Sequence, residues 1–149
     1  MATLIENQKA RFDYEILETF EAGMELRGFE VKALRSKKGS LTGAHVIVRN
    51  SEVYALNMHI PPYQPENTPS EYDPLRTRKL LLTKREIELL AHAEAQKGLT
   101  IVPLAVYNKG RVIKVSLAIA RGKKKYDKRE TLKQRESKHD IARTLKNET

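Results

Sequence analysis

Cysteine is absent from the 149 residues of the chain. This absence excludes disulfides and zinc sites that are ligated by cysteine. Long hydrophobic runs are absent too: no apolar stretch approaches the roughly 20 residues that a membrane-spanning helix needs. The N-terminus also lacks the apolar segment behind a basic start that marks a secretory signal. We therefore expect a cytoplasmic protein with no membrane partner.

Familiar catalytic motifs are missing as well. The sequence contains no G-x-S-x-G, no P-loop and no dinucleotide fingerprint. Its histidines lie far apart, without the short spacings of local metal motifs: His45, His59, His92 and His139. We expect no enzymatic activity, no cofactor and no metal. A small hydrolase or nuclease that uses Asp13, Glu15 or Glu21 with a metal is an alternative, which chelator-sensitive RNA turnover would support.

Acidic residues are too few to balance the basic ones. The chain has 19 Asp and Glu against 28 Lys and Arg, a net charge of +9. Residues 121–149 alone carry eleven Lys and Arg and five Asp and Glu, so that +6 of the charge lies in the last fifth and +3 in the first 120 residues. This asymmetry indicates an anionic partner. The length and the 40% hydrophobic content predict one globular domain over 1–120, followed by a basic tail over 121–149.

The basic tail cannot pack onto a core, because each Lys or Arg head group must stay hydrated or paired. Strong helix formers fill it, and neither glycine nor proline follows Gly122. We expect it to be disordered when free and helical when bound to a polyanion. A solvated terminus that only confers solubility is the alternative.

Periodicity predicts the elements of the domain. A polar, loosely held arm over 1–11 should precede a strand over 12–20 that Gly23 ends. The distribution of charge predicts a helix over 28–38, and the capping box of Thr83 and Glu86 predicts another that ends at Gly98, with Ile87, Leu90 and Ala91 facing inward.

Two hairpins are expected, one from runs 44–49 and 52–60 around Asn50 and Ser51, the other from runs 100–107 and 111–120. Tyr54, Leu56, Met58 and Ile60 should share a face of the first hairpin. Pro103 should lie at an edge or a bulge, and the proline-rich stretch 61–74 should be a loop. This order predicts a mainly β fold with flanking helices, an OB-like antiparallel β-barrel.

Basic clusters with interleaved aromatic residues favour a nucleic-acid binder. These clusters are Lys9/Arg11, Lys32/Arg35/Lys37/Lys38, Arg76/Arg78/Lys79 and the tail. Tyr63 and Tyr126 are the candidates for stacking on bases. Glu21, two residues before the break expected at Gly23, is a carboxylate suited to a hydrogen bond with a backbone group or a base edge. A general RNA-binding or ribosome-associated OB-fold protein is one reading of these features.

Several segments, in order, resemble the SsrA-binding protein family, also called small protein B. They are 7–10 (NQKA), Tyr14, 20–23 (FEAG), 28–35 (GFEVKALR), 73–82 (DPLRTRKLLL), 121–124 (RGKK) and 127–130 (DKRE). The resemblance implies a monomeric barrel, not an enzyme, that binds the tRNA-like domain of transfer-messenger RNA. With that RNA the family enters stalled ribosomes for trans-translation, which tags the incomplete peptide. The family's tail occupies the empty mRNA channel beside small-subunit rRNA.

The resemblance also assigns residues. Asn7, Glu21, Lys79 and Leu81 match positions of the barrel that are linked to RNA binding in the family, and Lys9 and Arg35 are added on charge alone. The positions that match tail motifs needed for accommodation in the ribosome are Gly122, Lys123, Asp127, Lys128 and Arg129. Tyr126 stands where some members carry His, so stacking is retained there while imidazole chemistry is not.

Overall fold

A computed structural model of the chain describes residues 2–123, and the positions expected at Tyr126, Asp127, Lys128 and Arg129 lie outside this range, as does the conformation expected of the basic tail. The described strands form one antiparallel sheet in the order β1-β6-β7-β2-β5-β4-β3. The helices and strands are β1 (Ala2–Glu6), α1 (Gln8–Asp13), β2 (Tyr14–Met24), α2 (Gly28–Arg35), β3 (His45–Arg49), β4 (Glu52–Leu56), β5 (Arg78–Leu81), α3 (Lys84–Ala95), β6 (Leu99–Lys109) and β7 (Val112–Gly122).

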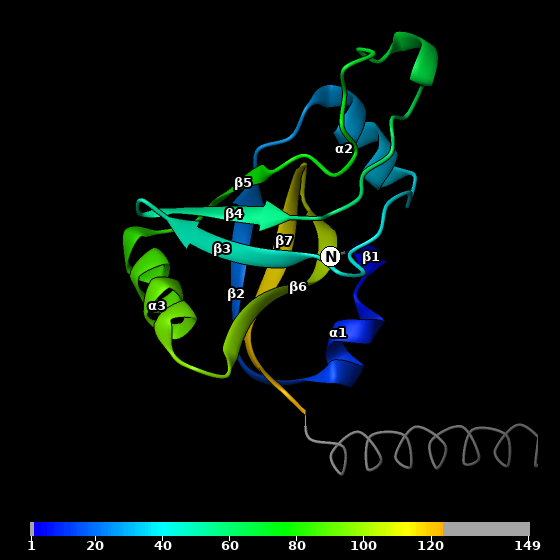
Figure 1. Cartoon of the computed structure of the whole chain (residues 1–149). Helices are drawn as coiled ribbons and strands as arrows, with labels where there is room; N and C mark the ends of the chain where they lie inside the picture. Colours follow the sequence, from blue (N-terminus) through cyan, green and yellow to red (C-terminus); the bar gives the residue numbers. More distant parts are fainter. Residues whose placement is uncertain (1, 124–149) are drawn as a thin grey trace, which may run out of the picture.

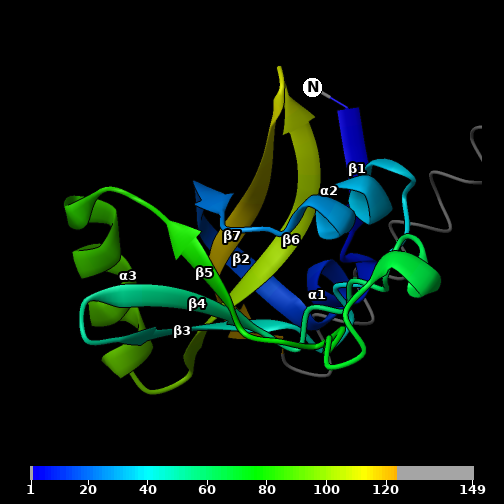
Figure 2. The ribbon, with the colours of Figure 1, turned by 90° about the horizontal axis from the view of Figure 1, so that it is seen from above.

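The sheet curls on itself, so that strands from its two ends come into contact. In Figure 1 the pair β3 and β4 crosses over β6, β7 and β2, and β3 at one edge of the sheet contacts β6 near the other edge. Figure 2 shows α3 on one side of this curled sheet and α1 and α2 toward the other. The expected mainly β, OB-like architecture with flanking helices is confirmed in this partly open form.

The main core fills the inside of the curl. The predicted alternation along β7 is confirmed, since Ile113, Val115, Leu117 and Ile119 are all buried. Other members come from every layer, among them Leu34 of α2, Val53 of β4 and Leu90 of α3.

A second, smaller cluster lies on the other face of β6 and β7. Here Ala10 of α1 covers Val102, Leu104, Ala118 and Ala120. Part of β7 is therefore buried on both faces, while Lys114 and Ser116, on the outer face toward its start, are only half-buried.

The N-terminal segment differs from the expectation of a loosely held arm. Residues 2–6 form β1, which pairs with β6, and residues 8–13 form α1. The strand expected from Phe12 begins instead at Tyr14, because Phe12 and Asp13 complete the helix. The expectation was wrong because six residues of helix are too short to show a periodic pattern.

Gly23 does not end β2, which continues to Met24. Gly23 pairs with Leu81 on one side and with Lys114 on the other. A Cβ atom at this position would lie 3.3 Å from the Cβ of Leu81 and 3.7 Å from the Lys114 Nζ. The glycine thus makes room for two neighbouring side chains within a sheet instead of breaking a strand.

The other expected elements are largely confirmed, with shifted ends. Asn50 and Ser51, at φ of 53° and 60°, form the turn of the first hairpin. Its second strand ends at Leu56, because Asn57 takes a φ of 60°, so Met58 and Ile60 are buried outside the strand and do not share its face with Tyr54. The helix over 28–38 ends three residues earlier, at Arg35.

The capping box of α3 is confirmed: the Glu86 backbone N–H donates to the Thr83 hydroxyl at 3.3 Å and the Thr83 N–H donates to the Glu86 carboxylate at 3.0 Å. The helix buries Leu90 and Ala93, whereas Ala91 is exposed, contrary to expectation. Pro103 lies at a bulge of β6, as expected. The loop 61–74 contains one turn of 3-10 helix, Pro65–Asn67.

Candidate nucleic-acid interface

The outer face of the sheet brings together three of the expected site residues. Glu21 of β2 and Lys79 and Leu81 of β5 lie on this face with Lys114 of β7 and with Tyr107 and Lys109 of β6. We call these six residues the sheet-face surface. Cross-strand pairing of Leu81 with Gly23, of Gly23 with Lys114 and of Lys114 with Tyr107 places them in adjoining rows.

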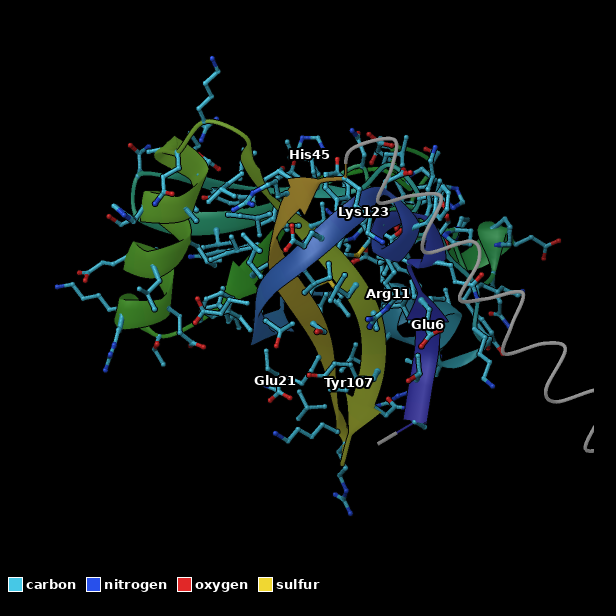
Figure 3. All side chains as sticks on the ribbon, turned by 90° about the horizontal axis from the view of Figure 1, so that it is seen from below. Glu6, Arg11, Glu21, His45, Tyr107 and Lys123 are labelled. Carbon is cyan, nitrogen blue, oxygen red and sulfur yellow. The ribbon has the colours of Figure 1, made fainter. Side chains whose placement is uncertain are left out.

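Glu21 is held by two donors from β6. The Tyr107 hydroxyl donates to Glu21 Oε2 at 2.6 Å, and the Lys109 Nζ donates to Oε1 at 2.9 Å. Figure 3 shows Glu21 and Tyr107 side by side on this face. The side chain of Glu21 keeps 36% of its area exposed, so the carboxylate is fixed yet open to a partner.

The electrostatics of this cluster keep Glu21 ionised and Tyr107 protonated. The hydrogen bonds from Tyr107 and Lys109, followed by the charges of Lys109 and Lys114, lower the pKa of Glu21. Burial and the hydrogen bond to Glu21 raise the pKa of Tyr107. Each carboxylate oxygen has two acceptor lone pairs, so each can accept a second hydrogen bond from outside the protein.

Lys79 is held by a similar set of groups on the same face. Its Nζ donates to Glu52 Oε1 at 3.2 Å, and the Tyr54 hydroxyl donates to the other oxygen of that carboxylate. The hydrogen bond to Glu52 is the largest cause that raises the pKa of Lys79, so the ammonium stays charged. Leu81, two residues further along β5, is 49% exposed. The surface therefore offers a cation, a carboxylate and an apolar side chain within one sheet.

Asn7, a fourth expected RNA-binding residue, is not part of the sheet-face surface and is only 4% exposed. Its Nδ2 donates to the Leu41 carbonyl at 3.2 Å and to the Pro103 carbonyl at 2.9 Å, and its Oδ1 accepts from the Ala10 N–H at 3.1 Å. The side chain thus caps α1 and joins it to two other segments. Direct contact of Asn7 with RNA stays a prediction.

The other expected residues of the N-terminal region gather around α1. Lys9 is exposed and lines an open pocket of about 350 Å³ between α1, β3 and the start of β6, together with His45. Gly122 ends β7 opposite Tyr14. The Lys123 N–H donates to the Asp13 carbonyl at 2.8 Å, and its Nζ donates to the Arg11 carbonyl at 3.4 Å. Residues expected to belong to the tail thus begin as part of the folded body, beside α1 (Figure 3).

Arg35 lies at the end of α2 among exposed basic side chains. Its guanidinium donates to the Arg111 carbonyl at 2.8 Å, which joins α2 to the tip of the hairpin between β6 and β7. The neighbouring Lys32, Lys37 and Lys38 are exposed, and the Lys38 Nζ lies 5.7 Å from the centre of the Tyr63 ring. The basic cluster expected here is therefore on the surface.

The basic cluster expected at Arg76, Arg78 and Lys79 is wrong for Arg78. Arg76 pairs with the same carboxylate as Arg78, that of Glu30, and keeps 23% of its side chain exposed. Glu30 and Arg78 are 0% exposed, and Glu30 Oε2 accepts from the Arg78 Nε at 2.8 Å and from the Arg76 Nε at 3.0 Å. The Tyr72 hydroxyl lies 2.9 Å from the same oxygen. We call Glu30, Tyr72, Arg76 and Arg78 the Glu30 cluster.

The Glu30 cluster leaves Arg78 with no donor for a phosphate. Its guanidinium also donates to the carbonyls of Met58 at 2.5 Å and of Pro74 at 3.0 Å. Burial by itself raises the pKa of Glu30, but the hydrogen bonds from Arg76 and the Arg27 N–H and the charge of Arg78 outweigh it and lower the pKa to about 2. Burial is also the largest cause that raises the pKa of Tyr72 to about 12.

The sequence did contain a signal for this burial. Arg78 alternates with Leu80 at the period of a strand, and Leu80 is 2% exposed, so the pattern places Arg78 on the same inward face of β5. Among residues 2–123, no group of three or more His, Asp or Glu side chains is arranged to bind a metal ion. No helix in that range is long and apolar enough to cross a membrane.

Comparison with known proteins adds three kinds of similarity. The family model described as SmpB protein matches residues 4–147. A protein of Microcystis aeruginosa named SsrA-binding protein is 50% identical over 143 residues, which cover 96% of this chain and 93% of that protein. Its namesake in Clostridium acetobutylicum is 49% identical over 145 residues, covering 97% of this chain and 93% of that protein.

A solved structure is similar in fold as well as in sequence. It is described as "tmRNA-SmpB: a journey to the center of the bacterial ribosome", and the superposition has a TM-score of 0.69 with 48% sequence identity. The match covers 81% of this chain and 85% of that one.

Proposed function

Because the chain belongs to the SmpB protein family, we propose that it binds the tRNA-like domain of transfer-messenger RNA and delivers that RNA to stalled ribosomes for trans-translation. The single observation that carries the proposal is the likeness along nearly the whole chain to proteins named for binding SsrA, the transfer-messenger RNA. The solved structure of such a protein with this RNA and the ribosome supports both partners. The protein then acts in the cytoplasm, as a binding protein and not as an enzyme.

The sheet-face surface supplies the side chains for this binding. Lys79, Lys109 and Lys114 offer positive charge to phosphates, Leu81 offers an apolar contact, and Glu21 offers an acceptor for donors on the RNA. A folded RNA is recognised mainly by its shape and by unpaired bases. We therefore assign these residues to binding of the tRNA-like domain. Lys9 and Arg35 add further phosphate contacts, and Asn7 contributes indirectly by holding α1 in place.

The two parts of the chain divide the work. The barrel, 1–120, binds the RNA, while the basic tail, 121–149, senses the empty mRNA channel beside small-subunit rRNA. Gly122 and Lys123 connect the parts, since they pack beside α1. Removal of 124–149, which preserves every described contact, should leave RNA affinity largely intact and abolish peptide tagging. Loss of RNA affinity in this truncated chain would contradict the division.

The deciding experiment is a salt titration of binding to the tRNA-like domain and to an unrelated hairpin RNA of equal length. The proposal predicts selective binding to the tRNA-like domain at physiological salt. Equal and steeply salt-dependent binding to both RNAs would mean that only a basic surface is involved. In that case a general RNA-binding OB-fold protein would be the better description.

A further inference from the structure

We propose that Tyr107 and Lys109 are positioning residues for Glu21, and that the carboxylate they hold binds the Watson–Crick edge of an unpaired guanine in the RNA. This inference deepens the proposed function and rests on it. Neither Tyr107 nor Lys109 stood out in the sequence as a site residue.

The geometry of the cluster leaves the two carboxylate oxygens available side by side. Tyr107 occupies one lone pair of Oε2, and Lys109 occupies one lone pair of Oε1. The remaining lone pairs match two adjacent N–H donors. Guanine presents such a pair at N1 and N2. The Watson–Crick edges of the other bases carry only one donor group, with a hydrogen-bond acceptor next to it.

The neighbouring cations explain how a carboxylate can serve on a surface that faces a polyanion. Glu21 would repel phosphates if its charge were uncompensated. Lys109 from β6 is in direct contact with it, and Lys114 from β7 also acts on it electrostatically. With Tyr107 these are the charged and titratable groups that act on Glu21 from β6 and β7. The result is a local acceptor within a surface that is not acidic.

Fixing the carboxylate before binding also lowers the entropy that is lost when RNA arrives. A free glutamate on a strand samples several rotamers and loses them on binding. Glu21 is already restrained by two hydrogen bonds from β6, which lies beyond β7 in the sheet, and one of them comes from the stiff ring of Tyr107.

A second set of groups with the same composition occurs elsewhere on the same face. Tyr54 donates to Glu52, and Glu52 in turn accepts from Lys79. There too the lysine and the carboxylate are both partly exposed, with 37% of the Lys79 side chain and 44% of the Glu52 side chain accessible. The face thus presents two pairs of a lysine and a carboxylate, each with a tyrosine hydroxyl that donates to the carboxylate.

The first test is a set of affinities for the tRNA-like domain. Glu21→Gln should weaken binding about tenfold, and Tyr107→Phe, which retains the ring, should weaken it about threefold. The double variant should bind no worse than Glu21→Gln alone, because Tyr107 acts through Glu21. Additive losses, or wild-type affinity in Tyr107→Phe, would overturn the positioning role. Glu88→Gln, which removes one exposed carboxylate from α3, is the matched control and should leave affinity unchanged.

The second test identifies the base. Single guanosines of the RNA are replaced in turn by inosine, which lacks the N2 amino group. One position should weaken binding of the wild-type protein and have no further effect on Glu21→Gln. If every position affects both proteins equally, Glu21 does not bind a guanine edge.

A titration of the free protein separates failure of this inference from failure of the proposed function. The carboxyl resonance of Glu21 is followed by NMR in the wild type and in Tyr107→Phe, without RNA. Loss of the hydroxyl should shift the titration of Glu21 to higher pH; an unchanged titration would refute the positioning role. Unselective RNA binding by the wild type would instead refute the proposed function. The NMR titration would still show whether Tyr107 holds the Glu21 carboxylate.

Discussion

Two glutamates of this chain have the same kinds of partner and opposite exposure. Glu30 meets Tyr72, Arg76 and Arg78, and is fully buried. Glu21 meets Tyr107 and Lys109, and keeps 36% of its side-chain area exposed. The chemistry of a carboxylate, a phenol and a cation is thus used twice, once inside the fold and once on its surface.

The difference follows from what surrounds each cluster. The partners of Glu30 come from the segment 72–78, so the cluster joins α2 to the end of the long loop and to β5. The partners of Glu21 come from a single strand that is already fixed by its ladder with β7. Loss of the first cluster should therefore unfold structure, whereas loss of the second should alter only the surface that a partner meets.

The largest effect is expected from Glu30→Gln, which removes the buried negative charge at nearly constant volume. Arg78 would remain fully buried without its counter-ion. Breaking a buried ion pair from one side costs about 3–5 kcal/mol, a large part of the stability of a small domain. Urea denaturation measures the loss, and Glu21→Gln is the matched variant that should unfold like the wild type. Equal stability of the two variants would contradict the claim that Glu30 stabilises the fold and Glu21 does not.

Acid should destabilise the wild-type protein through protonation of the buried Glu30. The pKa of Glu30 is lowered from an ordinary value of 4.5 to about 2. A lowered folded-state pKa stabilises the protein above the unfolded value, and this contribution of about 3 kcal/mol is lost as the pH falls from about 4.5 to 2. Urea denaturation across that range should show a steeper loss for the wild type than for Glu30→Gln. If Glu30 titrates near 4.5 by NMR in the folded protein, the prediction is wrong.

Paired tyrosine variants sharpen the comparison at a smaller scale. Tyr72→Phe removes the hydroxyl that accepts from Arg78 at 2.8 Å and lies 2.7 Å from the Ile60 carbonyl. Buried groups left unsatisfied cost about 1–3 kcal/mol. We expect that loss in thermal or urea unfolding for Tyr72→Phe, and little change for Tyr107→Phe. The reverse order of stabilities would contradict the assignment of one cluster to the fold and the other to the surface.

The smallest loss of stability is expected at Asn7, whose side chain is buried like that of Glu30. Asn7→Ser keeps a neutral side-chain acceptor for the Ala10 N–H and loses the donors to Leu41 and Pro103. A loss of about 1–2 kcal/mol is expected in urea unfolding, with RNA affinity reduced only to the extent that α1 is displaced. An RNA defect at full stability would instead point to direct contact by Asn7.

Much of the fold could be predicted because its longer elements carry a periodic pattern or a local signal. The alternation of β7, the capping box of α3 and the Asn50-Ser51 turn each depend on residues within one element. The helix α1 and the continuation of β2 through Gly23 could not be predicted this way. The first is too short for a pattern, and the second depends on Leu81 and Lys114, which are distant in sequence.

The candidate site was predictable to a similar degree. Resemblance to a family led to Glu21, Lys79 and Leu81, which the fold places on one face. Tyr107 could not be found this way, because it lies in a strand pattern like any core residue and its hydroxyl contact with Glu21 spans 86 positions of the sequence. Charge alone misplaced Arg78, because a buried arginine and a phosphate-binding arginine have the same sequence signature until their partners are known.

The most direct test of the account is to map the RNA onto the protein by NMR. Amide and side-chain shifts are recorded for the wild type with and without the tRNA-like domain of transfer-messenger RNA. The account predicts the largest changes at Glu21, Leu81 and Tyr107, with the buried Glu30 and Arg78 unchanged. Changes confined to α3, or spread evenly over every exposed lysine, would contradict the claim that the sheet-face surface binds the RNA.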